Sequence, residues 1–75
     1  MSEYIVIWKE APGQQVSTVV DAHDVPVRRS TAYLMAQDIP VLDDLSDVLT
    51  TLEHANGRKI AVEPELARSA LGWDL

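Results

Sequence analysis

The stretch EYIVIWKE, residues 3–10, contains the longest apolar run in the chain, YIVIW at residues 4–8. Its β-branched and aromatic residues favour an extended strand. Because successive side chains of a strand point to opposite faces, Tyr4, Val6 and Trp8 are predicted to share one face. A run this short cannot cross a membrane, which takes about 20 apolar residues. The stretch therefore predicts the first strand of a small sheet.

The residues that follow predict a β-hairpin. APG at residues 11–13 supplies a turn, because proline fixes its own φ and glycine tolerates a positive φ. The next segment, QQVSTVVD at residues 14–21, places Val16, Thr18 and Val20 on one face of a half-buried strand. The two strands are expected to pair across the turn.

A short helix is predicted after residue 30. Ser30 or Thr31 is a good N-cap, because a side-chain oxygen there can accept a hydrogen bond from a free backbone N–H. Pro40 would end this helix or separate it from the next. Helical spacing gives it an apolar face made of Ala32, Met35, Ala36 and Ile39.

The clearest helical pattern is VLDDLSDVLTTLEHANG, residues 41–57. Its apolar residues recur at intervals of three and four, which is typical of an amphipathic helix, and Asn56-Gly57 is expected to end it with a left-handed cap. We expect the stripe of Leu45, Leu49 and Leu52 to lie in the core. The full set of apolar positions is Leu42, Leu45, Val48, Leu49, Leu52 and Ala55.

The rest of the chain predicts one more strand and one more helix. RKIAVE at residues 58–63 is typical of a short strand, and PELARSAL at residues 64–71 of a helix that Pro64 opens and Gly72 closes. The predicted fold is a single α+β domain over residues 1–75. It contains a β-hairpin, two helices, a third short strand and a C-terminal helix, with the helices packed on one face of the sheet.

Acidic residues dominate the charge of the chain. Its 12 acidic and 6 basic residues give a net charge of −6. No basic residue lies between Arg29 and Arg58, whereas Asp43, Asp44 and Asp47 fall there, at the predicted start of the central helix, where the helix dipole favours negative charge. Such a chain repels phosphate backbones. The charge argues against nucleic acid and favours a protein partner with a basic surface.

Composition also bears on the cellular setting. The chain has no cysteine, so it forms no disulfide and no thiolate metal site, which fits a reducing cytoplasm. Its first ten residues, MSEYIVIWKE, lack the basic region of a signal peptide. We expect a cytoplasmic protein without a membrane segment.

The segment from Ala22 to Ala36 resembles the helix-turn-helix pattern, and RRSTAY at residues 28–33 looks like the start of a recognition helix in excisionase-like and repressor-like domains. The resemblance implies a DNA-binding regulator that uses residues 22–37. Three observations oppose it. Pro26 replaces the turn residue with positive φ, the would-be first helix is rich in β-branched residues, and positive charges are few. DNA binding is therefore the alternative hypothesis.

Catalytic patterns are weak in this sequence. His23 and His54 are the two histidines, and they are far apart along the chain. The three glycines are scattered, so they do not form a phosphate-binding loop. A metal site would need clustered ligands. We expect no enzymatic activity, no cofactor and no metal.

These observations lead to a functional hypothesis of binding. We expect a small non-enzymatic protein that binds a larger macromolecule and modulates it, by inhibition, as an antitoxin-like or phage- or mobile-element-encoded inhibitor would. Trp73 either folds back onto the core or contacts the partner, since tryptophan is a favoured interface residue. Homodimerisation through an uncovered hairpin edge stays open. The candidate contact residues are Asp43, Asp44, Asp47, Arg28, Arg29 and Trp73.

Overall fold

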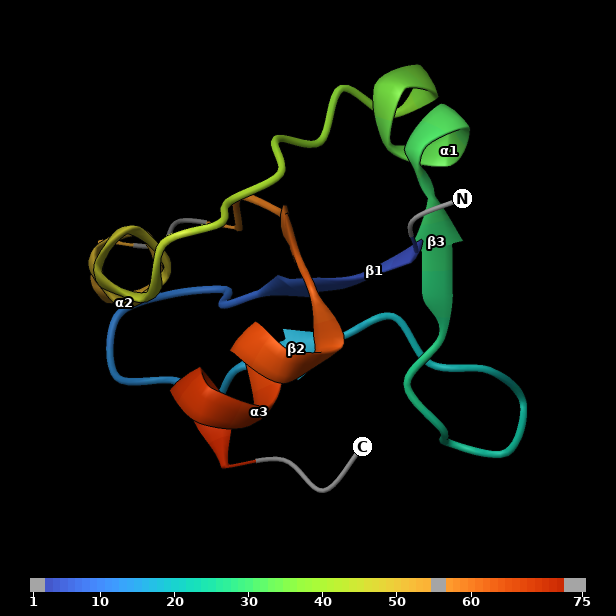
Figure 1. Ribbon diagram of the computed structural model, residues 1–75. Coiled ribbons are helices and arrows are strands. Elements are labelled where there is room, and N and C mark those ends of the chain that lie inside the picture. Colours follow the sequence, from blue (N-terminus) through green and yellow to red (C-terminus); the bar gives the residue numbers. More distant parts are fainter. Residues whose placement is uncertain (1–2, 55–56, 73–75) are drawn as a thin grey trace.

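The structure is a computed structural model that describes residues 3–54 and 57–72. Figure 1 shows β1 crossing the middle of the molecule, with α3 below it, α2 at one end and α1 beside β3 at the other. This is the α+β class that the sequence predicts. The elements are β1 (Glu3–Trp8), β2 (Ser17–Thr18), β3 (Arg28–Ser30), α1 (Thr31–Ala36), α2 (Leu45–Glu53), β4 (Ile60–Val62) and α3 (Pro64–Leu71).

The stretch that forms β1 is the centre of the sheet, because every other strand pairs with it in antiparallel orientation. Ile5 pairs with Arg28 of β3 and with Val62 of β4, and Ile7 pairs in the same way with β2 and β4. A residue in a sheet has one neighbour on each side. The strands β2 and β3 therefore follow one another along one edge of β1, and β4 occupies the other edge.

The predicted hairpin is confirmed. β1 and β2 pair antiparallel, with Trp8 opposite Ser17. In the turn between them, Gly13 has a φ of 84°, and the Gln14 N–H donates to the Ala11 carbonyl at 3.1 Å. Only glycine adopts such a φ without steric cost, so the turn chemistry read from the sequence accounts for the connection.

The strand β3 was not predicted. The sequence interpretation placed Arg28 and Arg29 in front of a helix, but both belong to a strand, with Arg29 opposite Tyr4. The chain is already extended before it, since Pro26 forms an antiparallel bridge with Val20. Residues 22–37 are all described, and they contain a turn, a strand and one short helix. The first helix of a helix-turn-helix is therefore absent from this segment.

The helices α2 and α3 cover one face of the sheet. Three isoleucines and one valine of β1 and β4 point toward them and are almost completely shielded from solvent. Aliphatic side chains of this kind gain the most from burial, at about 25 cal/mol per Å². This core consists of Ile5, Ile7, Ile60 and Val62 from the sheet, Val48 and Leu52 from α2, and Ala67 from α3.

The prediction for the central helix was right about its existence and about the burial of Leu52, and wrong about Leu45 and Leu49. Val48 and Leu52 are buried, whereas Leu45 is 40% exposed and Leu49 is 47% exposed. Leu45 and Leu49 lie one turn apart and form one row along the helix, and Val48 and Leu52 form the adjacent row. Only the row of Val48 and Leu52 packs against the sheet. The apolar stripe of the sequence was wider than the face that rests on the sheet.

The helix α1 also buries a different residue from those predicted. Ser30 is its N-cap, as expected, and its side chain accepts a hydrogen bond from the Tyr33 N–H. However, Met35 is 77% exposed, and Ala32 and Ala36 are exposed as well. Leu34 is buried instead. α1 has six residues, fewer than two turns, and Leu34 is the residue that it buries.

The ends of α3 were predicted correctly, and the end of α2 was not. α3 begins at Pro64 and closes at Gly72, whose N–H donates to the Arg68 carbonyl at 2.8 Å, as expected. α2 ends earlier than predicted, with His54 as its C-cap. Gly57 has a φ of 87° but donates its N–H to the Lys9 carbonyl at 3.0 Å. Asn56, the other residue of the predicted cap, lies outside the described residues.

Candidate functional sites

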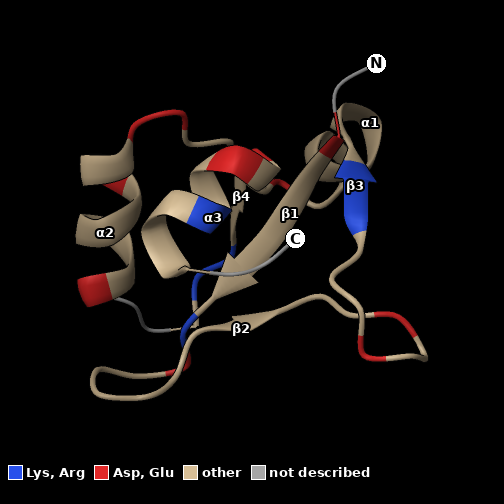
Figure 2. Cartoon of the chain, turned by 60° about the horizontal axis from the view of Figure 1, so that its bottom comes forward, with Lys and Arg blue, Asp and Glu red and all other residues tan. Residues whose placement is uncertain are grey.

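The three predicted aspartates are exposed at the start of α2. Asp44 is the N-cap, and its carboxylate accepts a hydrogen bond from the Asp47 N–H at 3.2 Å. Asp43 precedes the helix, which begins at Leu45. Among the described side chains, no Lys or Arg forms an ion pair with these carboxylates. Asp44 thus has a structural role, and Asp43 and Asp47 present free negative charge to solvent, as the acidic colouring of this end of α2 in Figure 2 shows.

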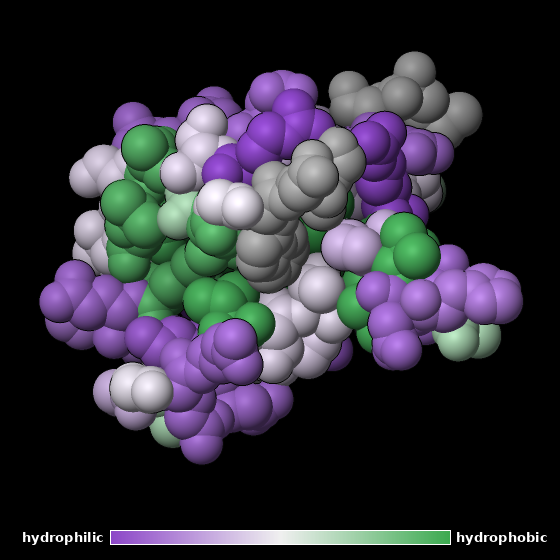
Figure 3. All heavy atoms as spheres, turned by 90° about the horizontal axis from the view of Figure 1, so that it is seen from below, coloured by the Kyte–Doolittle hydropathy of each residue, from purple (hydrophilic) through white to green (hydrophobic). Residues whose placement is uncertain are grey.

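Exposed leucines lie on another side of the same helix. Leu45 and Leu49, which we call the leucine row, are one turn apart and are each about half exposed. The neighbouring helix α3 adds apolar side chains that are only partly buried, namely Leu66, Ala70 and Leu71. Figure 3, which views the molecule from below, shows apolar side chains gathered on the side that α2 and α3 form.

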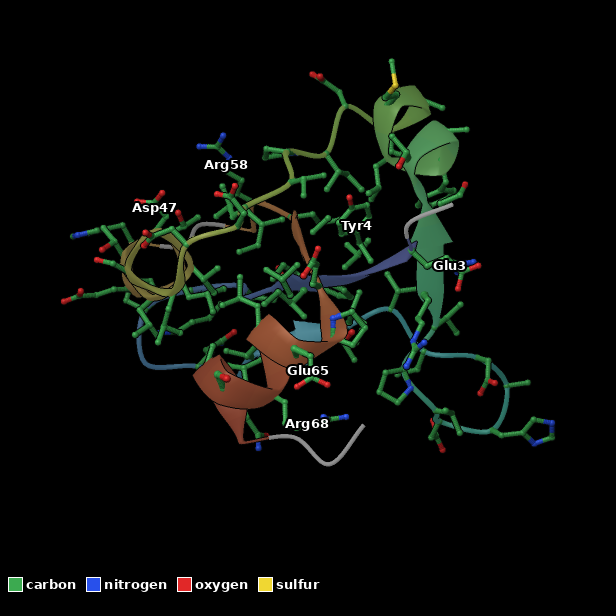
Figure 4. The ribbon with its side chains drawn as sticks, in the orientation of Figure 1. Glu3, Tyr4, Asp47, Arg58, Glu65 and Arg68 are labelled. Atoms are coloured by element: carbon green, nitrogen blue, oxygen red, sulfur yellow. The ribbon has the colours of Figure 1, made fainter. Side chains whose placement is uncertain are left out.

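The leucine row and the free aspartates face different directions. Asp47 and Leu49 are two residues apart, which places them roughly 200° apart around the helix axis. Figure 4 shows Asp47 on the upper side of α2, away from α3. A partner that lies on the leucine row would therefore not touch Asp47 directly. The leucine row and the aspartates can act on the same partner only if the carboxylates attract it electrostatically, without direct contact.

The predicted arginine pair lies at the far end of the sheet from α2 (Figure 2). Arg28 is exposed on β3. Arg29 is half-buried, and its guanidinium lies 5.0 Å from the centre of the Tyr33 ring. Its Nε is buried and makes no hydrogen bond within the described part of the chain. The structure does not bring this pair together with the aspartates, and Trp73, the last predicted contact residue, lies outside the described residues.

The sheet has a second face, which we call the open face. As predicted, Tyr4, Val6 and Trp8 share it. Its buried residues are Val6, Leu34 and Ala61, and the other apolar side chains around them are only partly buried. Figure 4 shows Tyr4 on the side of β1 where α1 lies, opposite Glu65 and Arg68 of α3. One short helix and the segment after it thus cover this face incompletely.

A cavity of about 410 Å³ remains on the open face. The sheet contributes Val6 and Val19 to it, α1 contributes Tyr33, and the segment before β4 contributes Arg58 and Lys59. Sequence reasoning missed this cavity, although one signal was present. Lys59 is two residues from Ala61, and strand alternation places such residues on the same face. The remaining lining residues are Gln37, Asp38, Ile39 and Pro40.

The polar loop between β2 and β3 has a local explanation. The Asp21 carboxylate accepts hydrogen bonds from the backbone N–H groups of His23, at 2.8 Å, and Val25, at 3.1 Å. Asparagine and aspartate commonly stabilise turns in this way. Within residues 3–54 and 57–72, no group of three or more His, Asp or Glu side chains could hold a metal ion. In the same residues, no helix is long and apolar enough to cross a membrane.

Comparisons of this chain with known protein families, with curated proteins and with solved structures find no match.

Proposed function

We propose that this protein is a non-enzymatic binding protein that docks through α2 and α3 on a larger protein with a basic and partly apolar surface, and modulates that partner. The observation that carries the proposal is the exposure of Leu45 and Leu49, at 40% and 47%, side by side on one helix. Two leucines one turn apart give a partner a continuous apolar strip along the helix.

The surroundings of the leucine row support a docking surface. Leu66 and Leu71 of α3 are partly buried and extend the apolar area beyond α2. Glu53 is exposed one further turn along the row from Leu49 and supplies a charged rim. An apolar centre with a polar rim is the usual composition of a protein interface.

The charge of the protein selects the partner. With a net charge of −6, the chain repels acidic surfaces and attracts basic ones. Asp47 lies across the width of one helix from the leucine row, about 10 Å, which is close to the screening length of physiological salt, and Asp43 precedes the same helix end. They can therefore guide the approach of a basic partner without touching it. In this proposal the leucines hold the partner and the aspartates steer it.

This division of roles is tested by kinetics. Partners are captured from a lysate of the source cells, and purified candidates are measured by surface binding at low and high salt. Changing Asp43, Asp44 and Asp47 together to asparagine should slow association and flatten its salt dependence. Folding should survive, because asparagine also caps helices. Leu45→Gln with Leu49→Gln should instead speed dissociation, since contact residues act mainly on the off-rate.

A third substitution on α2 serves as the control for both variant sets. Thr50→Gln changes an exposed position on the other side of α2 and should leave both rates unchanged, with circular dichroism confirming that each variant is folded. Parent-like kinetics for both variant sets would remove the partner surface from α2. A dimer of this chain that dissociates in the leucine variant would assign the surface to self-association. Salt-sensitive binding to duplex DNA that Arg28→Ala with Arg29→Ala abolishes would favour the DNA-binding alternative.

A further inference from the structure

The cavity on the open face collects positive charge, although the protein as a whole is acidic. Arg58 and Lys59 line it, and Asp38 is the carboxylate among its lining residues. A second hollow of about 420 Å³ adjoins it and shares Arg58. Figure 4 shows Arg58 on the same side of β1 as Tyr4, reaching away from the sheet. The lining thus carries one positive charge more than negative charges in a chain whose net charge is −6.

The positive charges of the cavity are not used up by ion pairs. Among the described residues, Arg58 makes neither an ion pair nor a side-chain hydrogen bond. Lys59 lies over the Trp8 ring, with its Nζ 5.2 Å from the ring centre. A ring attracts a cation without neutralising its charge. Both groups are therefore available to an incoming anion.

The accessible lining of the cavity is more polar than apolar. Val6 is fully buried, the partly buried Val19 and Ile39 supply a small aliphatic area, and Tyr33 supplies a ring. Arg29 holds that ring from outside the cavity, at 5.0 Å from its centre. The volume of 410 Å³ falls within the usual range of small-molecule sites, about 300–1,000 Å³, and the polar lining suits a charged ligand better than an apolar one.

We propose that this cavity binds a small organic anion, in which a carboxylate or a phosphate is joined to a planar ring. The anionic group would lie against Arg58, whose planar guanidinium can donate two parallel hydrogen bonds to either group. Lys59 would add a second charge, and the ring of the ligand would lie against the Tyr33 ring. This site is separate from the leucine row and does not depend on the docking role of α2.

Asp38 provides a test of the direction in which charge changes the affinity for an anion. Its carboxylate lines the same cavity and repels an anion, so Asp38→Asn should strengthen binding, by about three- to tenfold for a charge at this kind of separation. The backbone tolerates the change. Asp38 has a φ of 54°, in the left-handed region that asparagine also adopts readily. A substitution that raises affinity is not easily explained by damage to the fold.

The experiment uses NMR amide shifts of the full chain with four probes at millimolar concentration. Phenylacetate and phenyl phosphate carry both an anionic group and a ring, phenethylamine carries a ring with a positive charge, and inorganic phosphate lacks the ring. We expect the two aromatic anions to shift the amides of Tyr33, Gln37, Arg58 and Lys59, and the other two probes to leave them in place. Whichever of the two aromatic anions binds more tightly shows whether the site prefers a carboxylate or a phosphate.

A matched pair of variants completes the test. Arg58→Gln should weaken the better anion by about tenfold or more, because a charge-assisted pair is lost. Arg28→Gln makes the same charge change on exposed β3, outside the cavity, and should leave the affinity unchanged. The proposal is overturned if neither aromatic anion shifts these amides, if phenethylamine shifts them equally, or if the two variants weaken binding to the same extent.

Discussion

The two faces of the sheet are built from alternate residues of the same strand, yet they differ in almost every property. Ile5 and Ile7 point to the face that α2 and α3 cover, where the core is aliphatic and buried. Tyr4, Val6 and Trp8 point to the open face, where α1 contributes a single buried residue. The open face also holds the cations that lie over its aromatic rings.

In the proposal made for the open face, this difference separates stability from recognition. A covered aliphatic face gains most from the hydrophobic effect and offers nothing to a ligand. An incompletely covered face costs stability but leaves a cavity, aromatic rings and unpaired charges within reach of solvent. Because its side chains alternate, one short strand contributes both to the buried core and to the proposed anion site. Substitutions on the two faces should therefore differ in how much they cost and in what they disturb.

The largest expected effect comes from two identical substitutions on α2. Leu52→Ala removes a side chain that is 5% exposed and should lower the free energy of unfolding by about 2–5 kcal/mol. Leu49→Ala, three residues away, removes one that is 47% exposed and should cost roughly 1 kcal/mol or less. Urea denaturation followed by circular dichroism measures both.

The two variants control for each other, because the same side chain is shortened by the same atoms on the same helix, with the same change in helix propensity. Equal losses would mean that both rows of α2 are buried. In that case the leucine row would not be available to a partner, and the contrast between the covered and exposed sides of α2 would fail.

An intermediate effect is expected for Leu34→Ala, the buried anchor of α1 on the open face. Leu34 is 1% exposed, but it lies beside a hollow into which water and neighbouring side chains can move. Its loss should cost about 2–3 kcal/mol, toward the lower end for such a substitution. Hydrogen exchange should show lost protection in α1 and unchanged protection in α2. A loss spread equally over both helices would show that the two faces unfold as one unit.

The class of fold was readable from the sequence because the strongest patterns are local. The apolar run of β1, the turn at Gly13, and the Pro64 and Gly72 boundaries of α3 each follow from the chemistry of a few adjacent residues. The strand β3 was missed because Arg28 and Arg29 carry no strand pattern of their own. They are extended because β1 offers them an unpaired edge, which is information from distant residues.

The candidate sites were harder to predict for the same reason. A helical stripe states which residues are apolar, but which of its rows is buried depends on where the sheet lies, so Leu45 and Leu49 were misplaced. The cavity combines Val6, Tyr33 and Arg58, which are far apart in the sequence and meet only in the folded chain. The exposed aspartates at the start of α2 were found because a helix N-terminus is a local signal.

The smallest expected effect concerns the contact between Arg29 and Tyr33 on the open face. A guanidinium 5.0 Å from a ring centre should contribute about 0.5–1 kcal/mol when partly exposed. Single substitutions cannot measure this, because Arg29→Gln also removes a buried Nε that makes no hydrogen bond in the described residues, which offsets the loss.

A double-mutant cycle of Arg29→Gln and Tyr33→Leu cancels that contribution, since it is the same in both backgrounds. Urea denaturation of the four proteins should give a coupling of about 0.5 kcal/mol or more. A coupling indistinguishable from zero would mean that Arg29 does not hold the Tyr33 ring, and the wall of the cavity would then have to be positioned by the packing of α1 alone.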